Sequence, residues 1–120
     1  MTHEVEYTNE FGDWWTSLSD GEQNDITAVV ELLMEHGPHL RFPYSSGVAG
    51  SRHAHMRELR VQSGGKPLRI FYAFDPRRSA ILLIGGDKTG NARFYKQYVP
   101  VADRLYDVYL EELQQEGLIR

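Results

Sequence analysis

Three basic side chains of this sequence are spaced so that they could act together on a phosphate group. Arg60 and Arg69 fall on two consecutive stretches with strand-like alternation, and Lys88 follows a third. If these strands pair antiparallel in chain order, we expect the three cations to converge on one groove, with Phe71 and Tyr95 nearby. Arginine binds phosphate through two hydrogen bonds and stays protonated.

This set of side chains suits RNA cleavage without a metal ion. In that reaction the 2′-hydroxyl of the RNA attacks the adjacent phosphate, and cations stabilise the negative charge that develops in the transition state. An aromatic ring, here Phe71 or Tyr95, can stack an unpaired base. Neither a metal ion nor a small-molecule cofactor is required by this interpretation.

Simpler interpretations exist for the same residues. An arginine on a strand face is often a solubilising residue or the partner of an acidic residue on the next strand, and Tyr95 has the spacing of a helix-packing residue. The pair His53 and His55 could hold a metal only with a third ligand from elsewhere. The glycines before Lys88 lack the spacing of a nucleotide-binding loop.

Charge is strongly sorted along the chain. Residues 1–36 carry nine carboxylates and no lysine or arginine, whereas residues 37–104 carry twelve of the thirteen basic side chains and four acidic ones. The formal net charge is −4, but a polyanion responds to a local basic patch rather than to the total. The middle segment is therefore a candidate phosphate-binding surface.

Length and composition indicate one globular domain over residues 1–120. The absence of cysteine excludes disulfides, thiolate metal sites and thiol catalysis. Residues 1–10 lack the features of a secretory signal, and the longest apolar run, residues 80–84, is too short to span a bilayer. We therefore expect a cytoplasmic protein without a membrane segment.

The periodicity of apolar residues predicts an α+β fold. A short strand around residues 5–7 precedes a helix capped by Asn9 and a second helix opened by the capping box of Ser19 and Glu22. After an irregular segment over residues 39–55, three strands are predicted at 56–62, 68–74 and 80–84, followed by a flexible loop over 85–90. A C-terminal helix follows, and we expect the helices to cover one face of the sheet.

The C-terminal helix contains one residue that restricts where it can begin. Pro100 lies inside a stretch whose apolar residues recur at steps of three and four. Because proline is tolerated in the first turn of a helix, the long part of this helix is predicted to begin at Pro100.

The motifs resemble those of the RelE/HigB toxins of bacterial type II toxin–antitoxin systems, in the RelE/ParE superfamily, and the phage-associated HigB-like branch in particular. The resemblance covers roughly residues 40–113 and is carried by the segments 50–53, 56–60, 68–76 and 80–90. It implies a RelE-like fold: a small twisted, mainly antiparallel sheet with an N-terminal helical hairpin and a C-terminal helix.

The resemblance also implies a function and a set of site residues. Such toxins are ribosome-dependent mRNA endonucleases, and Arg69 matches the strand arginine that binds the scissile phosphate. Arg60, Lys88 and Tyr95 complete the expected catalytic set. The residues expected to bind RNA are Arg52, His53, Arg57, Phe71 and Arg93. The chain departs from the family pattern in its pI of about 5.7 and in lacking the C-terminal basic and histidine residues of some members.

Two other functions share this fold. A ParE-like protein poisons DNA gyrase by binding without catalysis, and a non-catalytic member of the fold would only bind a partner. Convergent cations favour the nuclease, because a binding protein has no need of them in one groove. For a toxin, the resemblance implies a cognate antitoxin, commonly with a helix-turn-helix domain, that covers the basic groove or packs on the acidic helical hairpin.

Overall fold

The computed structural model describes residues 2–120, and the elements follow local signals in the sequence. Ser19 caps the second helix, since its Oγ accepts a hydrogen bond from the Glu22 backbone N–H while the Glu22 carboxylate accepts one from the Ser19 N–H. The elements are β1 (Val5–Tyr7), α1 (Asn9–Thr16), α2 (Asp20–His36), the 3₁₀ turn η1 (Gly37–His39), β2 (Ser45–Gly47), β3 (Arg57–Ser63), β4 (Lys66–Phe74), β5 (Ala80–Asp87) and α3 (Phe94–Gln115).

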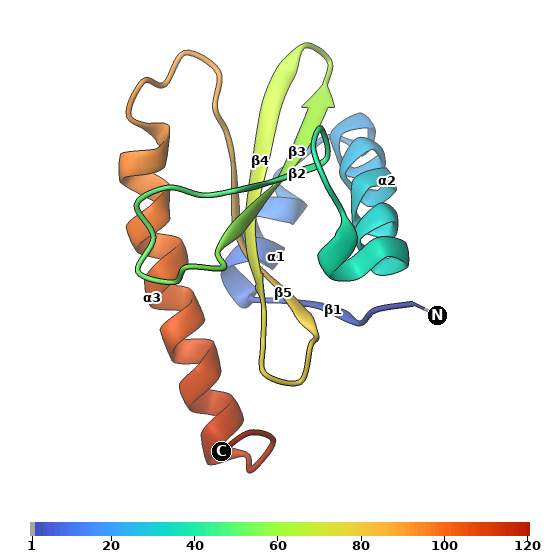
Figure 1. Ribbon diagram of the computed structural model, residues 1–120. Coiled ribbons are helices and arrows are strands. Elements are labelled where there is room, and N and C mark those ends of the chain that lie inside the picture. The colour runs from blue at the N-terminus through green and yellow to red at the C-terminus, as the bar shows by residue number, and fades with distance from the viewer. Residues whose placement is uncertain (1) are drawn as a thin grey trace.

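The strands form one sheet in the order β1-β5-β4-β3-β2, in which β1 runs parallel to β5 and the other neighbours are antiparallel (Figure 1). The predicted α+β class with a mainly antiparallel sheet is confirmed. The irregular segment predicted over residues 39–55 does contain one short strand, β2, which pairs with the first half of β3. The first helix is capped by Thr8 rather than by Asn9, because the Thr8 hydroxyl accepts from the Phe11 N–H and also donates to the Leu83 carbonyl of β5.

Helices cover both faces of the sheet, so the prediction that they cover one face was wrong. The helices α1 and α2 pack on one face, and α3 packs on the other, as Figure 1 shows. The reason lies in β4, which carries apolar side chains on both of its faces. Ile70 and Tyr72 face α1 and α2, whereas Phe71 and Ala73 face α3. A strand that is apolar on both faces has to be covered on both.

Strand β5 continues through Gly85 and Gly86, where the sequence had suggested a flexible loop. Both glycines are required by close packing on opposite faces of the strand. A Cβ at Gly85 would collide with the Trp14 ring of α1, and a Cβ at Gly86 would lie 2.7 Å from Cζ of Tyr98 in α3. The pair therefore marks a close approach of both helices to the sheet rather than a flexible connection.

Helix α3 begins at Phe94, so Pro100 lies in its interior, and the prediction that the long part begins at Pro100 was wrong. Proline lacks the N–H that would bond to the carbonyl of Lys96 four residues earlier. Both Pro100 and Lys96 are exposed, so water can satisfy that carbonyl. Phe94 and Val99, which precede the proline in α3, are both buried, and their burial keeps the first turns of the helix on the sheet.

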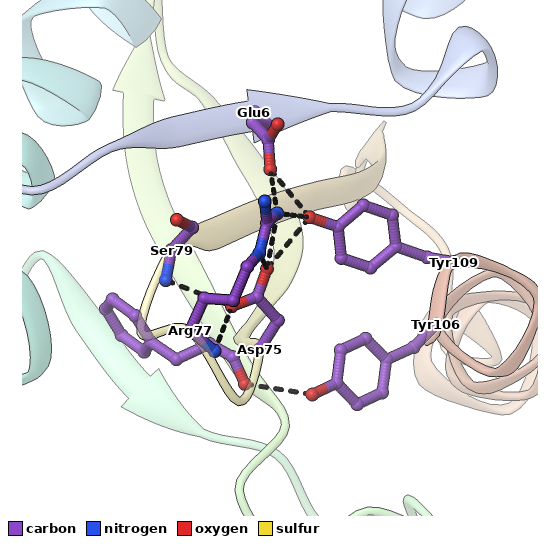
Figure 2. A network of polar contacts seen from close by, with 7 residues as sticks. Glu6, Asp75, Arg77, Ser79, Tyr106 and Tyr109 are labelled. Atoms are coloured by element: carbon purple, nitrogen blue, oxygen red, sulfur yellow. Dashed lines mark hydrogen bonds and ion pairs between the residues drawn. The ribbon is translucent and has the colours of Figure 1, made fainter. Parts of the chain in front are cut away.

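A polar network ties the C-terminal half of α3 to the sheet, as Figure 2 shows. The buried carboxylate of Asp75 accepts hydrogen bonds from the Arg77 side chain and from the Ser79 N–H in the turn between β4 and β5. The Tyr109 hydroxyl lies 2.9 Å from Asp75 and 2.6 Å from Glu6 of β1. Burial and these two carboxylates raise the pKa of Tyr109 well above its usual range, so the hydroxyl stays protonated in the network.

The described helices include none that is both long and apolar enough to cross a bilayer.

Candidate functional site

The centre of the candidate site is Glu58 of β3, whose side chain is 5% exposed. Its Oε2 accepts a hydrogen bond from Ser46 Oγ at 2.8 Å, and its Oε1 accepts one from the Tyr95 hydroxyl at 2.7 Å. Two guanidinium groups approach the same carboxylate: Arg60 Nη1 lies 3.5 Å from Oε2, and Arg69 Nε lies 3.7 Å from Oε1. Together with Lys88, these residues form what we call the Glu58 cluster.

Strand register explains why these side chains meet. In the antiparallel pairing of β3 and β4, Arg60 lies directly opposite Arg69. Two like charges at such a position repel each other. Glu58 precedes Arg60 by two residues and therefore points to the same face, where its carboxylate lies near both guanidinium groups. Sequence reasoning put Glu58 on this face but missed its role, which the spacing of two residues between Glu58 and Arg60 could have indicated.

Arg69 is the most enclosed cation of the cluster, with a side chain that is 5% exposed. Its Nη1 donates to the carbonyl of Leu68, but its Nε has no hydrogen-bond partner among the described residues. The contact with Glu58 is thus an ion pair without a hydrogen bond at Nε. A buried donor without an acceptor costs about 1–3 kcal/mol, so this N–H is a ready position for an incoming acceptor.

Tyr95 and Lys88 close one side of the cluster. Burial, followed by the hydrogen bond to Glu58, raises the pKa of Tyr95 above its ordinary value. The hydroxyl is therefore protonated at neutral pH and acts as a donor. Lys88 Nζ lies 5.4 Å from the centroid of the Tyr95 ring, in the geometry of a cation–π contact. The structure thus brings together all four residues predicted to be catalytic, Arg60, Arg69, Lys88 and Tyr95, with Glu58 between them.

Comparison with known proteins identifies the family of this chain. The family described as "Phage derived protein Gp49-like (DUF891)" matches residues 13–107. The chain belongs to the Gp49-like family. Two curated relatives from Mycobacterium tuberculosis are named as candidate toxins. HigB3 is 40% identical to this Gp49-like chain over 98 residues, which cover 81% of the chain and 84% of HigB3. HigB2 is 37% identical over 103 residues, 84% of the chain but 51% of HigB2.

The fold of this Gp49-like chain is that of RelE. A chain in the crystal structure of the archaeal RelE–RelB complex from Pyrococcus horikoshii OT3 aligns with a TM-score of 0.56 at 17% sequence identity. The alignment covers 77% of the Gp49-like chain and 100% of the archaeal one. The predicted resemblance to the RelE/HigB-like toxins, and the RelE-like fold that it implied, are confirmed.

Two of the predicted RNA-binding residues of the Gp49-like chain belong to a separate polar network on α3. Arg52 is paired with Asp107, and His53 Nε2 lies 2.7 Å from a carboxylate oxygen of the same residue. The Ser51 hydroxyl and the Arg52 N–H both donate to buried Asp103. This network anchors the segment before β3 to α3, and in it Nε2 of His53 is bound by the carboxylate of Asp107.

The other three predicted RNA-binding residues are divided among different environments. Arg57 Nε donates to Ser45 Oγ of β2 at 3.0 Å, which ties the start of β3 to its neighbour. Arg93 is exposed just before α3 and is free to contact a polyanion. Phe71 is 0% exposed and packs against the rings of Phe94 and Tyr98. In this structure Phe71 is a core residue with no surface for a base, because α3 covers the face of β4 on which it lies.

A second hollow region lies on the opposite side of the sheet, between α1, α2 and β1. It is an apolar groove of about 730 Å³ lined by Val5, Tyr7, Phe11, Gly12, Trp15, Thr16, Ile26, Thr27, Val30, Glu31, Met34 and Leu82. An adjoining hollow of about 300 Å³ includes Glu6, Glu10 and Glu112 in its lining. Tyr7 of β1, which is 66% exposed, is among the lining residues of both hollows. No basic side chain lines either hollow among the residues that the structure describes.

Proposed function

We propose that this Gp49-like toxin is an endoribonuclease that cleaves mRNA on the ribosome, and thereby inhibits translation in the cytoplasm. One observation supports the proposal above all: a buried carboxylate, Glu58, lies among two arginines and a protonated tyrosine, and one arginine N–H has no hydrogen-bond partner within residues 2–120. This arrangement offers a proton acceptor, positive charge for a phosphate and a neutral proton donor in one place.

The reaction can be written with these groups alone. The 2′-hydroxyl loses its proton to Glu58 as its oxygen bonds to phosphorus. The bond from phosphorus to the 5′ oxygen then breaks, which leaves a 2′,3′-cyclic phosphate and a 5′-hydroxyl. Tyr95 supplies the proton that the 5′ oxygen requires, because its hydroxyl is the neutral O–H donor that lies beside Glu58, and the proton on Glu58 can then return to the phenolate. Arg60, Arg69 and Lys88 stabilise the charge on the phosphate oxygens.

The side chains of the Glu58 cluster differ in how accessible they are. Arg60 and Lys88 are partly exposed and can meet the substrate first, whereas Arg69 is enclosed against Glu58. We propose that a bound phosphate draws Arg69 away from Glu58, which frees the carboxylate to accept a proton. The 3.7 Å contact between Arg69 and Glu58 is an ion pair without a hydrogen bond at Nε, so this movement breaks no hydrogen bond between the two side chains.

Primer extension on mRNA in a cell-free translation reaction tests this function. We expect cuts within codons that require ribosomes, and we expect Lys88→Ala to reduce the rate of cutting by about tenfold, since it removes one stabilising charge from a partly exposed position. Lys96→Ala, which removes the same charge from an exposed position on α3, is the matched control and should cut at the wild-type rate.

Other outcomes would redirect the assignment. Arrested translation without cuts would contradict the nuclease and indicate a protein that inhibits the ribosome by binding. If translation were unaffected, inhibition of DNA gyrase by the wild-type protein would favour the ParE-like alternative. Equal cutting by wild type and Lys88→Ala would remove Lys88 from the catalytic set.

We propose, in addition, that the apolar groove is the docking site of a cognate antitoxin, and that the helix-turn-helix protein expected from the family resemblance is that partner. The archaeal RelE was crystallised in complex with RelB, which supports an antitoxin for this chain. The negative charge around the groove indicates which kind of antitoxin segment would bind there, because residues 1–36 of this chain carry nine carboxylates and no lysine or arginine. The occupant is therefore a segment with apolar anchors flanked by basic residues.

A substitution at the rim of the groove tests this docking site. Met34, 37% exposed in α2, lines the groove, and Met34→Lys places a cation where a basic partner has to bind. We expect the affinity for the co-expressed antitoxin, measured by calorimetry, to fall by about tenfold or more, while RNA cleavage is unchanged. Leu118→Lys, at an exposed position near the C-terminus, is the control. Unaltered affinity of Met34→Lys would contradict the assignment.

A further inference from the structure

Phe42 is the most exposed large apolar side chain in the described part of the chain, at 70%. It lies in the segment that connects η1 to β2. The backbone around it is held in place: the Tyr44 N–H donates to the Arg41 carbonyl at 3.0 Å, and the Arg60 N–H donates to the Tyr44 carbonyl at 2.8 Å. These bonds hold the backbone on both sides of Phe42 beside β3.

The ring lies at the edge of the Glu58 cluster. The guanidinium carbon of Arg60 lies over the Phe42 ring, 5.0 Å from its centroid. The same guanidinium places Nη1 at 3.5 Å from the Glu58 carboxylate. Arg60 therefore joins Phe42 to the group that we assign as the proton acceptor, and most of the ring remains open to solvent.

We propose that Phe42 is a stacking platform for an unpaired nucleobase of the bound RNA, next to the bond that is cleaved. A flat apolar ring with an accessible surface is what a base requires, and a stacked base gains affinity whatever its identity. An arginine that contacts the ring and the acidic centre would orient the nucleotide between them. Phe42 thus supplies the surface for a base that buried Phe71 lacks. The ligand class rests on the proposed nuclease function.

Exposure alone would not distinguish Phe42, because single exposed apolar side chains are common on protein surfaces. Two further observations do so. Its cationic neighbour is the arginine that contacts Glu58, and a second aromatic residue, Tyr44, is 44% exposed two positions later. An apolar surface at the rim of a cationic cluster is the combination that single-stranded nucleic-acid sites use.

The test uses a short single-stranded RNA whose 2′-hydroxyls are methylated, so that it cannot be cleaved, and which carries the fluorescent base 2-aminopurine. Stacking on an aromatic ring quenches this fluorescence. We expect the wild-type protein to quench it, and Phe42→Leu to lose the quenching and bind about tenfold more weakly. Phe42→Trp, which keeps an aromatic ring, should retain both. Leu118→Ala, which truncates another exposed apolar side chain, is the matched control.

The outcomes separate this inference from the nuclease assignment. Quenching that depends on an aromatic residue at position 42 supports the stacking platform even if the protein fails to cut mRNA, in which case the nuclease assignment alone is overturned. No quenching by the wild-type protein, or equal quenching by wild type and Phe42→Leu, would overturn the stacking platform even where mRNA is cut.

Discussion

Replacing Glu58 by glutamine is expected to lower the rate of RNA cleavage by about a hundredfold to ten-thousandfold, the contribution that a positioned general base usually makes. Glutamine keeps the size of the side chain, and its amide oxygen can accept one of the two hydrogen bonds that Ser46 and Tyr95 donate to Glu58, while its NH2 group faces the other hydroxyl. The amide cannot take the proton of the 2′-hydroxyl. The measurement is the single-turnover rate of cutting on programmed ribosomes, taken with enzyme in excess so that binding and chemistry separate.

The matched control for Glu58→Gln is Glu111→Gln, the same exchange at an exposed position of α3. Both variants are checked for wild-type circular dichroism and urea unfolding. A Glu58→Gln variant that is folded and cuts at the wild-type rate would show that Glu58 only neutralises the two arginines. A slow variant with normal RNA binding would instead assign Glu58 to the chemical step.

Removing the side chain of Arg69 is expected to affect both cleavage and stability. Arg69→Ala should cut about a hundredfold to a thousandfold more slowly, as expected for the loss of a preorganised charge at the phosphate. It should also lower the free energy of unfolding by about 3–5 kcal/mol at most, because truncating one member of a buried ion pair leaves the other with less compensation. Arg60 remains 3.5 Å from Glu58 and should reduce this cost.

Arg69→Lys separates the two effects. Lysine keeps the positive charge beside Glu58 but loses the planar, bidentate contact with phosphate, so we expect near wild-type stability together with slow cleavage. Urea unfolding followed by fluorescence gives the stability, and primer extension gives the rate per folded molecule. If cleavage by Arg69→Lys and Arg69→Ala fell only in proportion to the folded fraction, Arg69 would be a structural residue and the phosphate-binding role would be wrong.

Local signals in the sequence were sufficient for most elements of the fold. The period of two in β3 and β4 and the capping box of α2 are determined by neighbours a few residues apart, so they can be read without the tertiary structure. The exceptions involve contacts between distant segments. The glycine pair in β5 was predicted to lie in a loop, because its close packing against Trp14 and Tyr98 involves residues far away in the chain. Pro100 was predicted to start the long part of a helix, whereas the helix begins at Phe94, which is buried.

The sequence by itself determined that Arg60 and Arg69 lie on adjacent strands, because alternation and chain order are local properties, and its ordered motifs predicted the toxin family. Only the tertiary structure decided what surrounds these arginines. The pairing register sets Arg60 opposite Arg69 with Glu58 beside them. The docking of α3 buries Phe71 and brings Tyr95 to Glu58, while the exposed Phe42 ring comes to Arg60 from a segment 18 positions earlier in the chain. Such contacts depend on how whole elements pack: the apolar pattern of β4 requires cover on both of its faces, but it does not specify which distant side chains reach Arg60, Arg69 and Glu58.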